Sequence, residues 1–123
     1  VIPTRERSKH PATRSFQAIR MHVNRELNEL ESVLPQAVDA LTARGRLVVI
    51  SFHSLEDRLV KRFMRKAASG YSFPPDLPVT HDFLRPTLRK IGKPLRPTVQ
   101  EVAANVRSRS AILRTAEKLN IAA

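Results

Sequence analysis

A short apolar segment, residues 46–52 (RLVVISF), constrains the fold of this chain more than any other feature. The segment is rich in β-branched side chains and lacks the alternation of a half-exposed strand. Such a segment is typical of a strand buried on both faces of a parallel sheet. Helical patterns precede it and follow it, and the alternation of helices with a buried strand indicates the α/β class.

Apolar side chains at intervals of three or four residues predict a long helix over about 15–33. They form one stripe, made of Phe16, Ile19, Val23, Leu27, Leu30 and Leu34. Thr13 or Ser15 can cap this helix. Residues 1–14 are largely polar, and we expect an extended arm there.

A proline and a glycine divide the chain between this helix and the apolar segment. Pro35 disfavours helical geometry in the residue before it but suits the first turn of a new helix. We therefore expect a second helix over about 35–43, ended by Gly45 in the left-handed conformation.

The apolar segment is followed by a helix signal over about 54–69. Ser54 and Asp57 resemble a capping box, and Gly70 follows as a stop. The apolar face consists of Leu55, Leu59, Phe63 and Met64, and the opposite face carries Arg58, Lys61, Arg62, Arg65 and Lys66. This basic face could follow a phosphate backbone or could simply be solvated.

The second half of the chain gives weaker signals. In order, they predict a loop over 71–86, an edge strand over about 87–93, a helix over about 99–106 and a strand over about 110–117. Thr98 and Glu101 form a capping box at the start of the helix. The last segment fits either a strand or a helix period.

Composition excludes several classes of site. The chain has 123 residues, only three glycines and no cysteine. Because the glycines are far apart, a glycine-rich nucleotide loop is absent and we expect no cofactor-binding residues in this chain. The lack of cysteine removes disulfides and thiolate zinc sites and suits a reducing cytosol. No apolar run approaches the roughly 20 residues that span a bilayer.

The net charge of +11 points to a polyanion as partner. Most of the excess lies in residues 61–123. Lysines and arginines that neutralise phosphates release condensed counterions on binding, which favours nucleic acid. An anionic membrane surface is the weaker alternative, because no basic helix here carries a broad aromatic and leucine face.

Polar groups gather where the 46–52 strand ends and the next helix begins. Ligands of open α/β sheets bind at such strand ends, so Ser51, His53 and Ser54 are candidates for lining a substrate cleft. The alternative is that these residues only cap the helix. His53 and Glu56 have the spacing of part of a metal motif, but no other histidine stands one helical turn away. No G-x-S-x-G elbow is present either, so neither a zinc site nor acyl transfer is favoured.

Five arginines are candidates for holding phosphates or organising a cleft: Arg14, Arg20, Arg58, Arg107 and Arg109. Arginine binds phosphate and carboxylate in a bidentate manner, so either partner fits. With one Tyr, five Phe and no Trp, an extended aromatic platform for stacked bases is not expected.

Several ordered blocks resemble a known family. They are His10–Arg20, Val23–Leu27, Ser51–Arg58, Arg107–Ser110 and Leu113–Glu117. Together they resemble the ribosomal RNA small subunit methyltransferase H family. That resemblance implies transfer of a methyl group from S-adenosylmethionine to the exocyclic N4 of a cytidine in bacterial 16S ribosomal RNA.

The resemblance covers the C-terminal portion of such an enzyme. It implies the late part of a class I, Rossmann-like methyltransferase sheet over 15–123, with a long N-terminal helix that returns from the end of a substrate-recognition insertion, and 1–14 as the end of that insertion. The glycine-rich cofactor loop belongs to a preceding half, so the S-adenosylmethionine site would lie mostly outside this chain.

The implied partners are 16S ribosomal RNA in the small ribosomal subunit and the missing N-terminal half, in the cytoplasm, with homodimerisation left open. This chain alone would be inactive. A non-catalytic basic module or fragment that docks on ribosomal RNA is the alternative, and the residue pattern alone does not decide between them.

Overall fold

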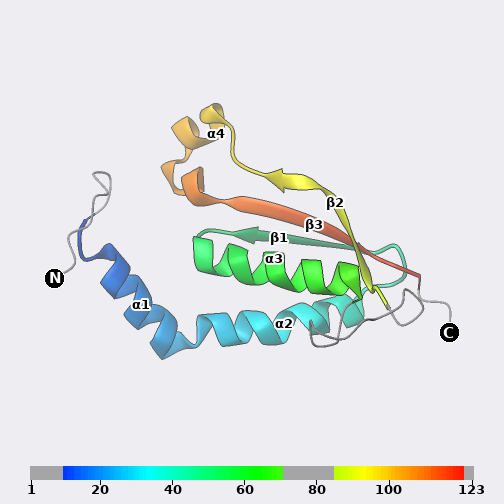
Figure 1. Ribbon diagram of the computed structural model, residues 1–123. Coiled ribbons are helices and arrows are strands. Elements are labelled where there is room, and N and C mark those ends of the chain that lie inside the picture. The colour runs from blue at the N-terminus through cyan, green and yellow to red at the C-terminus, as the bar shows by residue number, and fades with distance from the viewer. Residues whose placement is uncertain (1–9, 71–84, 121–123) are drawn as a thin grey trace.

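The computed structural model describes residues 10–70 and 85–120, so most of the expected arm and of the loop expected over 71–86 lies outside the described residues. The elements in order are α1 (Thr13–Asn24), α2 (Glu26–Ala40), β1 (Arg46–Ser51), α3 (Ser54–Ser69), β2 (Leu88–Leu95), α4 (Val99–Ala104), the 3₁₀ helix η2 (Val106–Ser110) and β3 (Ile112–Lys118). In Figure 1, α3 runs along one face of the sheet with α2 beside it, and α1 leads away.

The described strands form one three-stranded antiparallel sheet in the order β1-β3-β2. The register between β1 and β3 runs from Arg46 opposite Glu117 to Ser51 opposite Ile112. Antiparallel pairing corrects the expectation of a parallel sheet in this part of the molecule. Strand β2 lies at an edge of the described sheet, as Pro94 and Pro97 predict, although β2 extends to Leu95 and includes Pro94.

Within residues 10–70 and 85–120, strand β1 is covered on one face only, which corrects the expectation of burial on both faces. Leu47 and Ser51 are buried, whereas Val48 and Ile50 are 54% and 53% exposed. The described helices that pack on the sheet lie against the face that holds Leu47, so alternate side chains reach the opposite surface. An unbroken apolar sequence cannot distinguish this arrangement from burial on both faces.

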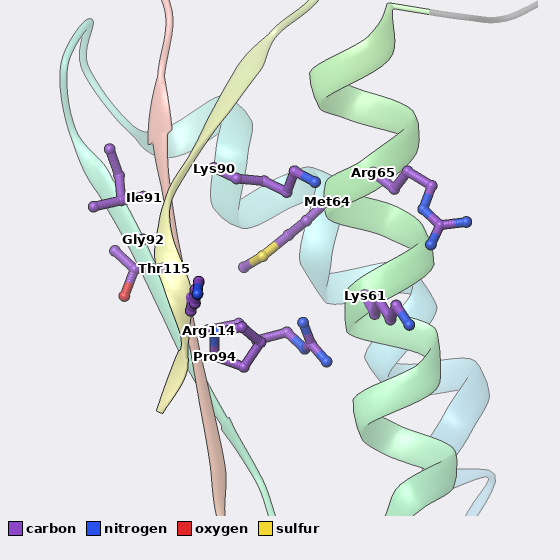
Figure 2. Close-up of a pocket in the computed structure, with 10 residues that line it drawn as sticks. Lys61, Met64, Arg65, Lys90, Ile91, Gly92, Pro94, Arg114 and Thr115 are labelled. Carbon is purple, nitrogen blue, oxygen red and sulfur yellow. The ribbon is translucent and has the colours of Figure 1, made fainter. Parts of the chain in front are cut away.

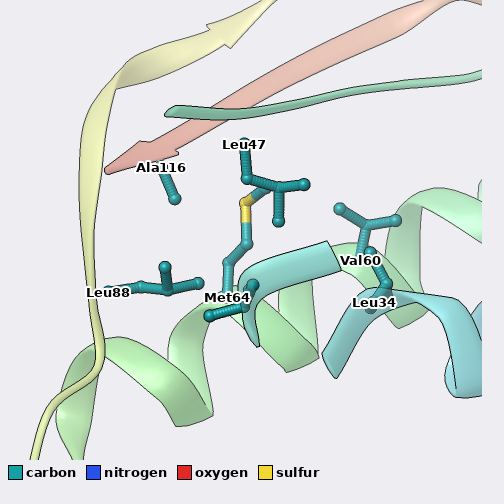
Figure 3. Close-up of a cluster of buried hydrophobic side chains, with 7 residues drawn as sticks. Leu34, Leu47, Val60, Met64, Leu88 and Ala116 are labelled. Carbon is teal, nitrogen blue, oxygen red and sulfur yellow. The ribbon is translucent and has the colours of Figure 1, made fainter. Parts of the chain in front are cut away.

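The core lies between the sheet and the two helices α2 and α3 (Figure 3). Its buried members are Leu34, Val38, Leu47, Val60, Met64, Leu88 and Ala116. Each helix and strand of this group contributes at least one side chain, and Val60 and Ala116 are fully buried. The core therefore fixes α3 against all three strands.

The break in the N-terminal helical region lies at Arg25, ten residues before the expected one. Arg25 adopts the left-handed conformation with φ 51°, which separates α1 from α2. Pro35 lies inside α2 without ending it. In the turn before the proline, the Gln36 side-chain amide donates to the Ser32 carbonyl at 2.9 Å and supplies a hydrogen bond there.

The apolar stripe of α1 does not reach the core. Phe16, Ile19 and Val23 are 68%, 59% and 72% exposed, and Met21 is the buried residue of this helix. The helix starts after Ala12 without a side-chain cap, so neither Thr13 nor Ser15 caps it. Periodicity thus predicted the helix correctly but not the surface on which it packs.

Glycine has two different roles at the helix ends. Gly70 ends α3 in the left-handed conformation with φ 66°, as expected. Gly45 does not: α2 ends at Ala40 with Leu41 as its C-cap, and Arg44 is the left-handed residue, with φ 66°. A Cβ atom on Gly45 would lie 2.9 Å from the Thr42 carbonyl oxygen, so close approach is what requires glycine there.

The connection between β2 and β3 contains the Thr98 and Glu101 capping box in the expected form. Helix α4 ends at Ala104, and the unexpected helix η2 follows it. None of the helices in the described ranges is long and apolar enough to cross a membrane.

Candidate functional site

A cleft of 780 Å³ lies at the end of the sheet where β1 finishes and β3 begins. It is lined by Thr13, Arg14, Phe16, Gln17, Arg20, Phe52, His53, Ser54, Arg96, Arg109, Ser110 and Ile112. These residues come from α1, the β1–α3 turn, the segment after β2, and the passage from η2 into β3. The cleft therefore joins four segments that are far apart in the sequence.

Strand register explains why distant residues meet here. Ser51 pairs with Ile112 at the end of β1, so the turn that follows β1 lies beside the segment that precedes β3. Leu95 of β2 pairs with Leu113 of β3, which brings Arg96 to the same end. Helix α1 closes the remaining side through Arg14 and its neighbours.

His53 caps helix α3 instead of Ser54. Its Nδ1 accepts a hydrogen bond from the Glu56 backbone N–H at 3.3 Å, so the neutral ring carries its proton on Nε2. Nε2 lies 3.2 Å from Glu56 Oε1, within ion-pair distance but without hydrogen-bonding geometry. Glu56 Oε2 accepts from the Phe52 backbone N–H at 3.1 Å, so the turn is held at both ends.

Arg20 is tied to a carboxylate across the helix break. Its Nε and a terminal nitrogen donate to the two oxygens of Glu26 at 2.8 Å and 3.1 Å. This hydrogen-bonded guanidinium holds the pKa of Glu26 below its usual value. Arg20 therefore orients α1 relative to α2 as well as lining the cleft.

One group of donor atoms beside the cleft has the composition of a metal site. Single ligand atoms of Glu26, His53 and Glu56 lie within 4.8 Å of one another. Glu26, however, is already paired with the guanidinium of Arg20 in a bidentate manner, and this positive charge opposes a cation at the same oxygens. The group is thus explained as a polar network that supports the β1–α3 turn.

Asp57 joins the start of α3 to β3 instead of completing a capping box. Its two oxygens accept from Arg114 at 2.7 Å and 3.0 Å, and the side chains are 15% and 17% exposed. The hydrogen bonds from Arg114 hold the pKa of Asp57 below its usual value. This pair fixes one wall of the cleft against the central strand.

The structure brings together five of the candidate residues and separates three. Arg14, Arg20, His53, Ser54 and Arg109 line the cleft. Ser51 is buried, 3% exposed, beneath it. Arg107 lies in η2 outside the lining, and Arg58 lines a different groove, between α2 and α3.

Sequence reasoning missed Arg96, Phe16 and Phe52 as lining residues. Phe16 was assigned to a buried stripe and Phe52 to the end of a buried strand, although both are exposed. Arg96 carries no local signal, because its place depends on the pairing of β2 with β3. The only sequence feature that pointed toward Arg96 was the excess of positive charge in residues 61–123.

A smaller cavity of 180 Å³ lies between α3 and β2 (Figure 2). Lys61 and Arg65 line it from the helix and Lys90 from the strand, while Met64 projects from α3 toward the sheet. Its basic rim continues the solvated face of α3, on which Arg58, Lys61, Arg62, Arg65 and Lys66 are all exposed. The cleft and this helix face are thus separate basic regions of the part of the chain that the structure describes.

Comparison with known proteins settles the family. The model of the MraW methylase family matches residues 1–119. The chain belongs to this family. Proteins named ribosomal RNA small subunit methyltransferase H are among its relatives, and those from Nitrosococcus oceani and Nitrosomonas europaea are each 59% identical to it, over 118 and 119 residues. The relative from Dechloromonas aromatica is 55% identical over 119 residues.

These alignments cover most of this chain but a much smaller share of each relative. They include 94% to 96% of this chain but only 38% to 39% of each of these three relatives. The chain thus spans about two fifths of the length of the curated relatives that it matches. The resemblance of its sequence blocks to this family is confirmed.

Proposed function

We propose that this chain is the RNA-facing part of a methyltransferase that moves a methyl group from S-adenosylmethionine to N4 of a cytidine in 16S ribosomal RNA. The observation that carries the proposal is the cleft, in which four arginines surround the polar β1–α3 turn. Membership of the MraW methylase family and relatives named as ribosomal RNA methyltransferases support it. In this proposal residues 15–123 are the late part of a Rossmann-like domain.

The described residues do not fit the S-adenosylmethionine site itself. Gly45 and Gly70 lie in separate turns and Gly92 lies within β2, so they do not form a phosphate- or nucleoside-binding loop. When bound, the cofactor supplies an electrophilic methyl group. We place its site mainly in the part of the relatives that this chain does not span.

The chain's own contribution would be to orient the substrate. Methyl transfer to an exocyclic amine needs the amine held in line with the sulfonium methyl, and it develops little new charge on the protein side. Ser54 is exposed in the cleft and suits a direct contact with the base. His53 keeps the turn in place through Glu56, and buried Ser51 supports it from below.

The arginines of the cleft would have two roles, phosphate binding and organisation of the cleft. Arg14, Arg96 and Arg109 are exposed and line the cleft, so they suit phosphate contacts. Arg20 is held by Glu26 and acts as an organising residue. Arg58 and Arg107 lie outside the cleft and have no role at this site in the proposal.

A chimera tests the proposal directly. This chain replaces the matching segment of the Nitrosococcus oceani relative, and methylation of small ribosomal subunits is followed with labelled S-adenosylmethionine. We expect activity from the chimera and a loss of about 10-fold or more in Ser54→Ala and His53→Ala. Ser32→Ala, on the outer surface of α2, is the control. Full activity in both turn variants would remove the turn from the mechanism.

The alternative is a basic module that docks on ribosomal RNA without catalysis, and the exposed basic face of α3 favours it. The chain by itself should bind RNA in either case. Isothermal titration of the isolated chain with S-adenosylmethionine should give no binding heat. An inactive chimera that still binds ribosomal RNA would favour the docking module.

A further inference from the structure

Two of the five phenylalanines of the chain lie exposed on the walls of the arginine-lined cleft. Phe16 is 68% exposed and Phe52 is 56% exposed. They come from different elements, α1 and the β1–α3 turn, and neither belongs to the core. Single exposed apolar side chains are common on protein surfaces, but two exposed aromatic rings that line the same concave site indicate a binding surface.

The backbone around each ring is fixed. The Phe52 N–H donates to Glu56 Oε2 at 3.1 Å, in the turn that His53 also caps. Phe16 lies one helical turn before Arg20 on α1, and Arg20 is anchored by Glu26. Both rings are therefore presented by ordered segments, and a ligand would not have to order them on binding.

The charge around the rings selects the ligand. Arg14, Arg20, Arg96 and Arg109 line the same cleft, and none of the described residues that line it is a carboxylate. An apolar peptide would cover the rings but would bring no negative charge to this basic lining. A nucleotide within an RNA strand has a flat ring with an anionic phosphate on each side, so it matches both the rings and the positive charge of the cleft.

We propose that the cleft holds an unpaired nucleobase of single-stranded RNA by stacking on Phe16 and Phe52, with the flanking phosphates on the surrounding arginines. The proposal rests on the proposed function and deepens it, because it specifies the form of RNA that is recognised. A base in a duplex has both faces covered by its neighbours and cannot stack on a side chain. The cleft volume of 780 Å³ lies within the range of about 300–1,000 Å³ of small-ligand sites.

The binding of short labelled RNA, measured by fluorescence anisotropy with the 123-residue chain, tests this proposal. Stacking on a side chain accounts for a factor of about 5 to 150 in affinity per base. Phe16→Ala and Phe52→Ala should each bind single-stranded RNA about 10-fold more weakly. Val23→Ala, an equally exposed apolar change on α1 outside the cleft, should bind like the unaltered chain.

Conservative variants separate stacking from simple apolar contact. Phe52→Tyr keeps a π-face and should retain affinity, whereas Phe52→Leu keeps apolar area and should lose as much as alanine. Because no charge changes, the slope of log affinity against log salt should stay the same in every phenylalanine variant. When the RNA lacks the base at the bound nucleotide, Phe52→Ala and the unaltered chain should bind it with the same affinity.

The outcomes distinguish this proposal from the proposed function. If Phe16→Ala and Phe52→Ala bind single-stranded RNA as tightly as the unaltered chain, or if Phe52→Leu keeps full affinity for it, the stacking proposal is wrong. The proposal that the chain binds RNA would not be affected by that result. Equal affinity for a duplex and a single strand of the same length would overturn it too. Failure of the unaltered chain to bind any RNA would overturn both proposals.

Discussion

At the scale of single residues, two carboxylates of α3 determine how the cleft is held. Glu56 fixes the turn through the backbone of Phe52 and through His53, and Asp57 fixes the helix to β3 through Arg114. Sequence spacing pointed to Asp57 as part of a capping box with Ser54. It could not show the partner of Asp57, because Arg114 is 57 residues away and meets it only in the folded sheet.

The pair of Asp57 and Arg114 gives a pH-dependent contribution to stability. Arg114 lowers the pKa of Asp57 on folding, so the contribution is complete above the pKa of an unfolded aspartate, about 4. It is lost as the pH falls through the lower pKa of the folded state. Asp57→Asn should lower the free energy of unfolding at pH 7 by about 2 kcal/mol, and the deficit should shrink below about pH 4.

Urea titrations of the two proteins between pH 7 and pH 3 measure this difference. Glu29→Gln, which changes an exposed carboxylate on α2, serves as the control and should shift the free energy of unfolding little. A deficit in Asp57→Asn that is the same at every pH would show that the ion pair is not its cause.

At the scale of elements, local signals located most helices and strands. Helix α3 spans the expected residues because Gly70 stops it and acidic residues start it. The break at Arg25 was missed, since the apolar stripe continues in phase through it and arginine is not a residue type that signals the left-handed conformation. The antiparallel pairing was missed because an apolar strand does not encode the direction of its neighbour.

Two left-handed glycines provide a matched test of the element boundaries. A Cβ atom on Gly70 would lie 2.5 Å from the backbone nitrogens of Arg85 and Pro86, whereas one on Gly92 would meet no atom within 4 Å. Gly92→Ala should lower the free energy of unfolding by about 1 kcal/mol, from the left-handed backbone alone. Gly70→Ala should lower it by more, because the segment at Arg85 must also move.

Thermal unfolding followed by circular dichroism compares the two alanine variants. The expected order of melting temperatures is the unaltered chain, then Gly92→Ala, then Gly70→Ala. Equal melting temperatures for the two variants would mean that α3 does not end against Arg85 and Pro86 in solution.

At the scale of the whole molecule, the net charge is +11, and two clusters of basic side chains stand out among the described residues. One is the cleft and the other is the exposed basic face of α3. Composition predicted a polyanion as partner, and the family resemblance is confirmed by the match over residues 1–119. Neither could tell which region would bind such a partner, since the cleft exists only after β1, β2 and β3 have paired.

The salt dependence of RNA binding decides between the regions. Each phosphate contact with a single strand contributes about −0.7 to the slope of log affinity against log salt. A triple change of Arg14, Arg96 and Arg109 to glutamine should therefore make the slope shallower by about 2. A triple change of Arg62, Arg65 and Lys66 to glutamine removes equal charge from α3 and should alter the slope far less.

The most direct test of this account is that comparison, made by anisotropy with one single-stranded RNA over a series of salt concentrations. The account predicts a shallower slope and weaker binding for the cleft triple variant, with the α3 triple variant close to the unaltered chain. An α3 triple variant that loses as much slope as the cleft triple variant, or more, would contradict the claim that RNA is bound in the cleft.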